Sequence, residues 1–552
     1  MKHILALLFS IWLFFSSSVA YAVTIKVCNQ TEFDRIQDQI FETVAAGMKD
    51  ITVRIGPGTF FFRDNHIRLC GLDWQGISLR LEGEGCILTG AGAVFSSGEP
   101  FGESFSGWET LIDNDGVLMD WFGKSKKCLF PVEVVDENEE LCRLKAEGLQ
   151  DKTAEECQTV YIKLTEWYRS RIYHVQEIRS GYIYFKADGL RRVSPLPFGY
   201  NVNYDLIYGR KLPRYRLCNI QEGDKGQPDL RSGRLFLPEG CQQARLCKSG
   251  CFLDIADVHL QSLKLSGITF CGNSVHANPS LIRFDKLSCT AGSEIANCIF
   301  QSIRSYLFHG RDMADFYFHD NLIQDCPGFG LVSDIRTSGT RIENNRFQNT
   351  GKDGLPSFCI QISGNDYIIR GNSFKNFGYA AIAVGLGPEI DYSGPSQGII
   401  EDNVLSYDAD YLSQIDRFGL MDSGAIYLTT RQDGTIVRNN LITNIDGIKD
   451  NRGIFCDDGA RNFTLQNNTI LGISNSFGID SRRVTDFEEK CGPANINISI
   501  LGNITDSPIR FEGHPGKNGC SFGIQHLRRN NKGSYPAIYC RNILHVSKPI
   551  RE

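Results

Sequence analysis

Acidic, arginine and aromatic residues concentrate between residues 422 and 512, beside short apolar segments. They are Asp422, Tyr427, Arg431, Phe455, Asp457, Asp458, Asp480, Arg482, Arg483, Arg510 and Glu512. Pairs of carboxyl groups can transfer protons as general acid and base, and the guanidinium fork of arginine binds carboxylate or sulfate groups. The residue types therefore predict acid–base chemistry, or the binding of an anionic group, if the fold brings them to one face.

The alternation of side chains along a strand predicts which of these residues share a face. A mostly small residue followed by an apolar one recurs at Gly330-Leu331, Cys359-Ile360, Ala381-Ile382, Ala425-Ile426, Gly453-Ile454, Gly478-Ile479 and Pro508-Ile509. If the apolar residue points inward, the residues one and three positions later point outward. These outward pairs are Val332/Asp334, Gln361/Ser363, Ala383/Gly385, Tyr427/Thr429, Phe455/Asp457, Asp480/Arg482 and Arg510/Glu512. The early pairs consist mostly of small or uncharged residues. A functional site on this face is therefore expected toward the C-terminal half.

The acids of this face suit hydrolysis of a glycosidic bond. Asp457 and Asp480 lie one repeat and two positions apart, which places their backbones roughly 8 Å apart in a β-sheet. Inverting glycosidases separate their acid and base by roughly 6.5–9.5 Å. Asp422 and Asp458 flank the same segments and are further candidates. The alternative is a solvated or calcium-binding acidic patch.

The arginines suit a different reaction, β-elimination. Arg482, Arg483 or Arg510 could neutralise the carboxylate of a uronic acid, while Tyr427 accepts the C5 proton that this neutralisation acidifies. His309 is a further candidate base, although the alternation places it inward. Arg431, Phe455, Arg510 and Glu512 are the candidates for substrate binding. The alternative is that the arginines pair with the neighbouring acids as a surface network.

An Asn-centred phrase followed by apolar residues indicates the elements that position these side chains. It begins at Asn297, Asn321, Asn345, Asn372, Asn403, Asn440, Asn468 and Asn503, at steps of 24, 24, 27, 31, 37, 28 and 35 residues. Repeats of this length mark a solenoid, and the strand–turn–strand unit without a helical stretch makes it a β-helix. The Asn column predicts side-chain amides that bond from coil to coil. A second outward column aligns His319 with Asn344, Arg370, Glu401, Arg438 and Gln466.

The chain divides into five predicted segments. Residues 1–22 have the apolar run and small-x-small site of a signal peptide, and 23–115 hold a capping helix over Thr31–Met48 and the first coils. Residues 116–255 form an inserted Cys-rich β module, 256–515 the solenoid repeats, and 516–552 a C-terminal cap or tail. Export to the periplasm or outside the cell is expected.

Composition narrows the possible partners. The net charge of −6 argues against nucleic acid, which requires a basic footprint. After the signal, no segment has the ~20 apolar residues of a membrane helix. Some of the 19 cysteines should pair in an exported chain, although Cys359 and Cys456 fit buried apolar positions. A metal site is not identified, and calcium is a possible cofactor.

Three coil phrases carry a resemblance to a known family. Asp422-Ser-Gly-Ala-Ile-Tyr, Asn439-Asn-Leu-Ile-Thr-Asn and Gly453-Ile-Phe-Cys-Asp-Asp-Gly-Ala resemble right-handed parallel β-helix carbohydrate-active proteins of the pectin-lyase-like superfamily. The resemblance implies a right-handed all-β solenoid with a polysaccharide along one sheet. The Asp phrases are similar to those of a group of β-helix glycosidases, with Asp422 and Asp457 or Asp458 at the matching places. The Gly-His-Gly and Arg-Ile-Lys phrases of pectin hydrolases are absent, as is a groove lysine that would match the alginate-type lyases.

Three functions fit these observations. The first, which we favour because arginines lie beside the acids of an acidic protein, is a lyase on a uronic-acid polysaccharide, glycosaminoglycan-like polymers included. The second is an inverting glycoside hydrolase that uses paired aspartates. The third is a non-catalytic solenoid that binds glycans.

Overall fold

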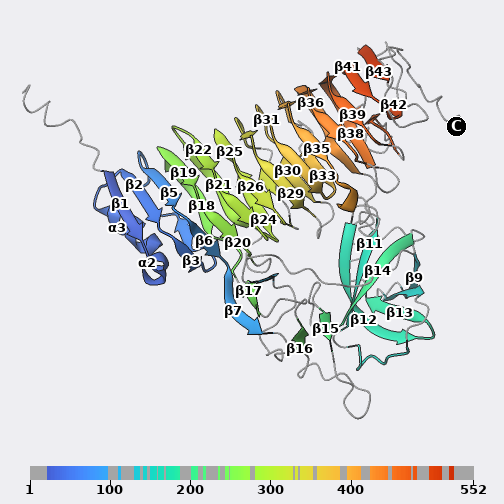
Figure 1. The fold of residues 1–552 in the computed structure, drawn as a ribbon, viewed down its shortest axis with the longest axis horizontal. Helices are drawn as coiled ribbons and strands as arrows, with labels where there is room; N and C mark the ends of the chain where they lie inside the picture. The colour runs from blue at the N-terminus through green and yellow to red at the C-terminus, as the bar shows by residue number, and fades with distance from the viewer. Residues whose placement is uncertain are drawn as a thin grey trace, which may run out of the picture.

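The protein is a right-handed parallel β-helix, seen in a computed structural model (Figure 1). The structure describes residues 22–71, 73–96, 110–113, 130–136, 141–145, 150–157, 160–166, 169–186, 201–208, 216–218, 234–236, 243–247, 249–273, 280–326, 328, 330–333, 336–351, 357–385, 395–411, 423–445, 451–473, 476–481, 496–511 and 521–526. The predicted signal peptide lies outside these residues except for Ala22, which begins the first strand. No helix in the described ranges is long and apolar enough to cross a membrane.

Parallel pairing from coil to coil divides the solenoid into three sheets. Sheet A contains β1 (Ala22–Val27), β2 (Asp50–Ile55), β5 (Ser78–Gly83), β19 (Ser262–Ser266), β22 (Ser293–Ala296), β25 (Phe316–His319), β28 (Arg341–Glu343), β31 (Ile368–Arg370), β34 (Ile399–Glu401), the ends of β36 (Ser423–Arg438) and β38 (Asn451–Gln466), β41 (Ser499–Thr505) and β43 (Ser521–His526). β43 adds a parallel strand within residues 516–552, the segment expected to be a C-terminal cap or tail.

Sheets B and C complete each coil. Sheet B contains β3 (Gly58–Phe61), β6 (Cys86–Thr89), β20 (Thr269–Cys271), β23 (Ile299–Gln301), β26 (Leu322–Gln324), β29 (Arg346–Thr350), β32 (Ser373–Phe377), β35 (Val404–Ser406), β37 (Leu441–Thr443), β39 (Thr469–Leu471) and the end of β41. Sheet C contains β4 (Ile67–Leu69), β18 (Leu253–Leu260), β21 (Ser280–Cys289), β24 (Tyr306–Arg311), β27 (Leu331–Ser333), β30 (Phe358–Ile362), β33 (Ala380–Val384), the beginnings of β36 and β38, β40 (Ile479–Ser481) and β42 (Ile509–Phe511).

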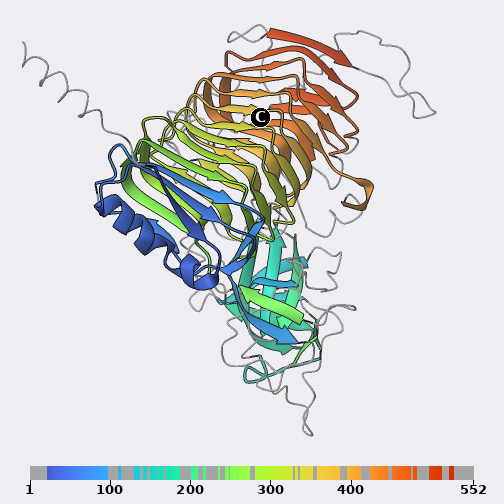
Figure 2. The ribbon, with the colours of Figure 1, turned by 60° about the vertical axis from the view of Figure 1, so that its left-hand side comes forward.

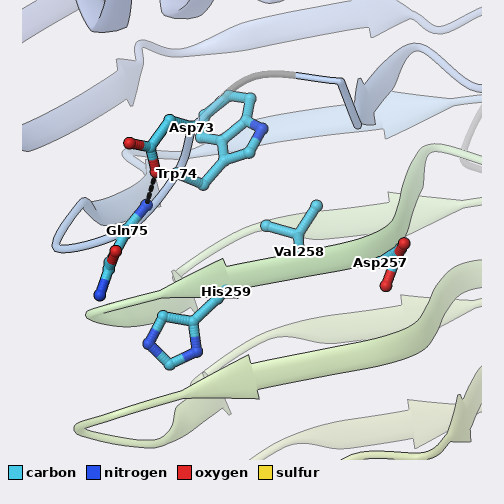
Figure 3. A pocket seen from close by; sticks show the side chains of 6 residues that line it. All are labelled: Asp73, Trp74, Gln75, Asp257, Val258 and His259. Carbon is cyan, nitrogen blue, oxygen red and sulfur yellow. Dashed lines mark hydrogen bonds between the residues drawn. The ribbon is translucent and has the colours of Figure 1, made fainter.

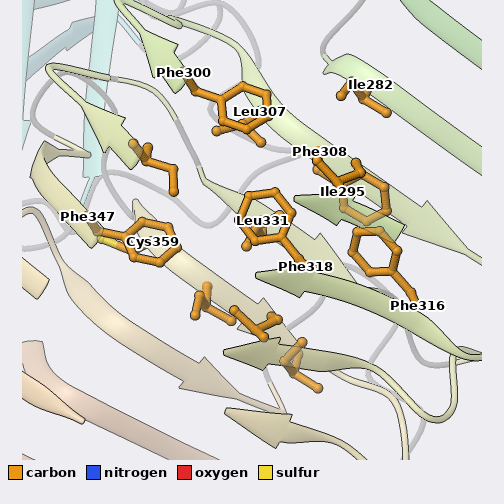
Figure 4. Packing of buried hydrophobic residues seen from close by; sticks show 14 of the residues in the cluster. Ile282, Ile295, Phe300, Leu307, Phe308, Phe316, Phe318, Leu331, Phe347 and Cys359 are labelled. Carbon is orange, nitrogen blue, oxygen red and sulfur yellow. The ribbon is translucent and has the colours of Figure 1, made fainter. Parts of the chain in front are cut away.

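The core lies inside the three sheets and is built from stacked side chains. Phe300 stacks on Phe318 with ring centroids 5.9 Å apart, and Phe308 stacks on Phe316 at 4.4 Å (Figure 4). Each coil can bury its apolar face only against its neighbours, so the Phe300–Phe318 stack joins two adjacent coils, whereas Phe308 and Phe316 pack within one coil. Cys359 and Cys456 are buried in the same core, as their positions in the repeats predicted.

The Asn ladder predicted from the repeats is present, with one correction. Each Nδ2 donates to the Oδ1 of the next asparagine at 2.8–3.0 Å, through Asn321, Asn345, Asn372, Asn403, Asn440, Asn468 and Asn503. Asn297 does not belong to the ladder, because Cys298 occupies its position and donates its backbone N–H to Asn321. Asn297 is exposed at the preceding turn with φ of 54°, a conformation that asparagine tolerates better than most residues.

Two helices, not one, follow β1. Helix α2 spans Gln30–Asp34 and α3 spans Ile36–Ala45. The N-cap is Asn29, whose side chain accepts the Glu32 N–H at 3.0 Å, so the first helix begins one residue before the predicted Thr31. The chain bends at Arg35, so the expected continuous helix over Thr31–Met48 is divided there. The pair packs beside the first coils (Figure 2).

Antiparallel strands occupy the chain between β6 and β18. β9 (Phe130–Asp136), β10 (Leu141–Lys145), β11 (Val160–Glu166), β12 (Arg169–Arg179), β13 (Tyr182–Lys186) and β14 (Asn201–Tyr208) close into a barrel beside the solenoid (Figures 1 and 2). β7 (Ala91–Ser96), β8 (Thr110–Asp113) and β17 (Gln243–Cys247) form a three-stranded sheet, and β15 (Arg216–Cys218) pairs with β16 (Arg234–Phe236). β6 pairs directly with β20, so the solenoid ladder continues across the insertion.

Candidate functional site

The register of sheet C agrees with the alignment made from the sequence. Leu331, Ile360, Ile382, Ile426, Ile454, Ile479 and Ile509 pair in turn from strand to strand. In the next column, Tyr427 pairs with Phe455, Phe455 with Asp480, and Asp480 with Arg510. The alternation therefore places these four side chains on one outer face of the solenoid.

Tyr427 and Asp457 form a direct pair on this face. The Tyr427 Oη donates to Asp457 Oδ2 at 2.9 Å, across the adjacent strands β36 and β38. Asp457 lies two residues after Phe455, whose ring meets that of Tyr427 edge-on at 4.8 Å. Tyr427 and Phe455 are buried, and Asp457 retains 6% exposure. The phenol thus orients a carboxylate that is mostly shielded from water.

Asp480 is held between two arginines on the same face. Arg452 Nε donates to Asp480 Oδ2 at 2.5 Å, while Arg510 donates from Nε to Oδ1 at 2.7 Å and from Nη2 to Oδ2 at 2.6 Å. Asp480 and Arg452 are fully buried, and Arg510 keeps 24% side-chain exposure. The Arg452 guanidinium covers the Phe455 ring at 3.9 Å. This carboxylate is fully engaged by guanidinium groups and has no direct access to a sugar.

The thiol of Cys456 lies on the core side of the same strand, between Phe455 and Asp457. Burial raises the pKa of Cys456 well above its ordinary value, and the carboxylates of Asp480 and Asp457 raise it further. A neutral, buried thiol is a poor nucleophile, so the polar chemistry of this face rests on oxygen and guanidinium groups.

Of the remaining acid and arginine candidates, the structure describes the side chain of Arg431 only. Arg431 is half exposed and pairs with Asp433, a contact that lowers the pKa of the Asp433 carboxyl. Asp422, Arg482, Arg483 and Glu512 lie outside the described residues. Asp458 belongs to β38, but its side chain lies outside the described part. The described residues contain no group of three or more side chains suited to a metal ion.

Two histidine assignments change. His309 pairs with Val332 and so belongs to the outward column, whereas the sequence placed it inward. His319 pairs with Glu343, and not with Asn344 as aligned from the sequence. For His309 the slip of one residue reverses the predicted direction of the side chain, because successive residues of a strand point to opposite faces. His319 keeps its predicted outward column, because Glu343 pairs with Arg370 and the register continues through Glu401 to Arg438 and Gln466, so only Asn344 was misplaced.

The chain matches no protein-family profile and no curated protein. Solved structures do match it. The chain is similar to a glycoside hydrolase. That structure has 12% identity and a TM-score of 0.53, and the match covers 91% of this chain and 97% of the hydrolase. At this identity the likeness to the hydrolase establishes the fold.

Two further matches superpose less closely than the glycoside hydrolase. An exopolygalacturonase from Thermotoga maritima has 11% identity and a TM-score of 0.33 over 50% of this chain and 81% of its own. A mannuronan C-5 epimerase module from Azotobacter vinelandii has 11% identity and a TM-score of 0.31 over 90% of this chain and 89% of its own.

Sequence reasoning missed Arg452, the fully buried partner of Asp480. Strict alternation back from the inward Ile454 places Arg452 in the core. A Cβ on Gly453 would meet Ile470 and Ile473, so Gly453 also faces the core, and the alternation is interrupted there. A glycine next to a charged residue at the start of an apolar strand was the available signal.

Proposed function

We propose that the protein is an exported carbohydrate-active enzyme that hydrolyses a glycosidic bond of a polysaccharide on sheet C. Asp457 is its catalytic carboxylate, and Tyr427 positions it. The observation that carries this proposal is the 2.9 Å hydrogen bond from Tyr427 Oη to Asp457 Oδ2. A carboxylate that accepts a fixed donor is oriented for proton transfer or for attack on a sugar.

The burial of Asp480 assigns it a supporting role. Arg452 and Arg510 donate to both oxygens of this fully buried carboxylate, so neither oxygen is available to a leaving group or a sugar. The second catalytic carboxyl group is therefore Asp422 or Asp458, the two candidates that neighbour β36 and Asp457 in the sequence. Phe455 lies beneath Arg452 and forms part of the wall of the candidate site. The partly exposed Arg510 contacts the substrate. Arg431, Arg482, Arg483 and Glu512 remain candidates for further contacts.

The state of Tyr427 favours hydrolysis over elimination. As a lyase base, Tyr427 would have to become a phenolate next to the Asp457 carboxylate, so two negative charges would adjoin. The similarity to a glycoside hydrolase over 91% of the chain also supports hydrolysis. A lyase is the second candidate, because the partly exposed Arg510 could hold the carboxylate of a uronate.

The test is the type of product that the full-length protein releases. Acidic and neutral polysaccharides are incubated with the protein, and both reducing ends and absorbance near 235 nm are followed. Hydrolysis gives reducing ends without new absorbance, whereas elimination gives an unsaturated, absorbing product. New absorbance would reject the hydrolase hypothesis in favour of the lyase. Binding of a polysaccharide without either product would indicate a non-catalytic, glycan-binding solenoid.

Asp457→Asn tests the assigned residue. Loss of the carboxylate should lower kcat by about 10²- to 10⁴-fold, which is the usual contribution of general acid–base catalysis. Asp325→Asn makes the same change at a turn of sheet B, where Asp325 accepts from Asn349, and should keep full activity. Equal activity in the two variants would remove Asp457 from the mechanism.

A further inference from the structure

Two cavities lie end to end along the corner where the strands of sheet C turn into sheet A. The first, about 440 Å³, lies between Trp74 and its neighbours on one side and Val258 and His259 of β18 on the other (Figure 3). The second, about 410 Å³, is lined by residues that include Thr290, Lys264 and Tyr317. His259 Nε2 lies 3.4 Å from Thr290 Oγ1, so the two cavities share a wall on adjacent coils.

The corner runs parallel to the solenoid axis. Gln261 N donates to Ile77 O at 2.8 Å, and Ala291 N donates to Gln261 O at 2.7 Å. Ser293 N donates to Asp315 O at 3.0 Å, and the next coil follows at Gly339, which lines the second cavity. Five coils thus contribute to the corner, a span of ~19 Å at the usual distance between strands. A trough of this shape suits a linear polymer better than a compact small molecule.

The lining offers hydrogen-bonding groups with an excess of negative charge. The carboxylates are Asp73, Asp257, Glu294 and Asp315, and the cations are Lys264 and Arg341. Four carboxylates against two cations leave the lining formally negative, which disfavours an anionic polymer. The indole N–H of Trp74 is buried and has no hydrogen-bond partner in the described part of the chain. Carboxylates and an unsatisfied N–H are suitable partners for the hydroxyl groups of a neutral glycan.

Part of the wall is already fixed in place. The Tyr317 ring stacks on His319 at 3.9 Å, and the Arg341 guanidinium covers it at 4.8 Å. Tyr317 Oη donates to Glu343 at 2.9 Å, and Lys264 Nζ donates to Glu294 at 2.7 Å. Side chains held in this way lose little conformational freedom when a ligand binds.

We propose that this corner is a second glycan-binding groove, which holds a neutral polysaccharide chain away from the candidate active face. The groove ends near Arg341, on the coil that contains β27, and β38 with Asp457 lies four sheet C strands further on, at β30, β33, β36 and β38. That separation is again ~19 Å. The groove therefore shares neither Tyr427 nor Asp457 with the candidate active face.

The test is native affinity electrophoresis of the full-length protein in gels that contain mixed-linkage β-glucan, arabinoxylan, galactomannan or polygalacturonate. Asp457→Asn is the background, so that the polymer is not degraded. At least one neutral polysaccharide should retard the protein. Asp73→Ala/His259→Ala and Lys264→Ala/Arg341→Ala, one pair in each cavity, should each weaken the apparent affinity at least fivefold. Arg35→Ala/Glu42→Ala removes an exposed ion pair on the helices and should change nothing.

The outcomes separate this groove from the active face. Retardation by polygalacturonate alone, or by no polymer, overturns the proposal, and so does wild-type affinity in both groove variants. Weaker binding in only one of them overturns a continuous groove. Loss of hydrolysis in Asp457→Asn with unchanged retardation supports two separate sites. The four substituted groove residues are exposed, and the unfolding midpoint of each variant checks that the fold is intact.

Discussion

Asp480 on sheet C and Glu401 on sheet A are both carboxylates bound by two arginines, in different surroundings. The arginines are Arg452 and Arg510 for Asp480, and Arg370 and Arg438 for Glu401. Both carboxylates are buried. Arg452 is fully buried, however, whereas Arg370 and Arg438 keep 42% and 40% side-chain exposure. Each cluster combines one carboxylate with two arginines. The clusters differ in the exposure of the arginine side chains to water.

This difference assigns the two clusters different roles. On sheet A, water continues to solvate the guanidinium groups, so the cluster is a surface network of modest energy. On sheet C, Arg452 has lost its water and depends on Asp480 for compensation. In the proposed function Asp480 therefore supports the floor of the candidate site, and Asp457, which keeps 6% exposure, is the carboxylate left to react.

The largest effect is expected for Asp480→Asn. The change leaves Arg452 buried without its carboxylate, which should destabilise the protein by about 3–5 kcal/mol. Glu401→Gln makes the same chemical change between two solvated arginines and should cost only about 1 kcal/mol. The shift of the urea unfolding midpoint measures both. Equal shifts would mean that access of water to the arginines does not distinguish the clusters.

A smaller effect is expected for Tyr427→Phe, which removes the hydroxyl that contacts Asp457. The lost hydrogen bond should cost about 1 kcal/mol of stability. Catalysis should fall about tenfold in kcat with KM unchanged, because the contact orients a reacting group and does not bind substrate. Tyr367→Phe removes a buried hydroxyl that contacts Thr435 at 3.3 Å, with a similar cost in stability and no loss of activity. A fall in activity in both variants would point to general loosening of the fold.

The outer face could be predicted from the sequence because strand alternation has a period of two. Once Ile426, Ile454 and Ile479 were aligned as core residues, the positions of Tyr427, Phe455 and Asp480 on one column followed. The same period explains why a slip of one residue in the alignment reversed the predicted direction of the His309 side chain.

Burial and partners could not be predicted in the same way. Alternation predicts that the Asp480 side chain points out of its sheet. It does not predict burial, which depends on how side chains from other coils pack over Asp480. The pairing of Asp480 with Arg452, 28 residues earlier, required an interruption of the alternation at Gly453. The sequence favoured a lyase and offered Asp480 as one partner of Asp457 in the alternative hydrolase, whereas the geometry supports Asp457 alone among the described acids.

The smallest effect concerns the acid dependence of the sheet A cluster. Burial alone would raise the pKa of Glu401, but the hydrogen bonds and charges of Arg438 and Arg370 outweigh it and hold the pKa below its ordinary value. A carboxyl whose pKa is lowered by folding stabilises the protein above its unfolded value of about 4.3, and this contribution disappears as the pH falls through the folded value. The difference in stability between wild type and Glu401→Gln should thus be full at pH 7 and shrink below about pH 4. Urea titrations of both proteins at pH 7 and pH 3.5 measure it. A difference that stays constant would show that the arginines act on Glu401 through packing and not through its charge.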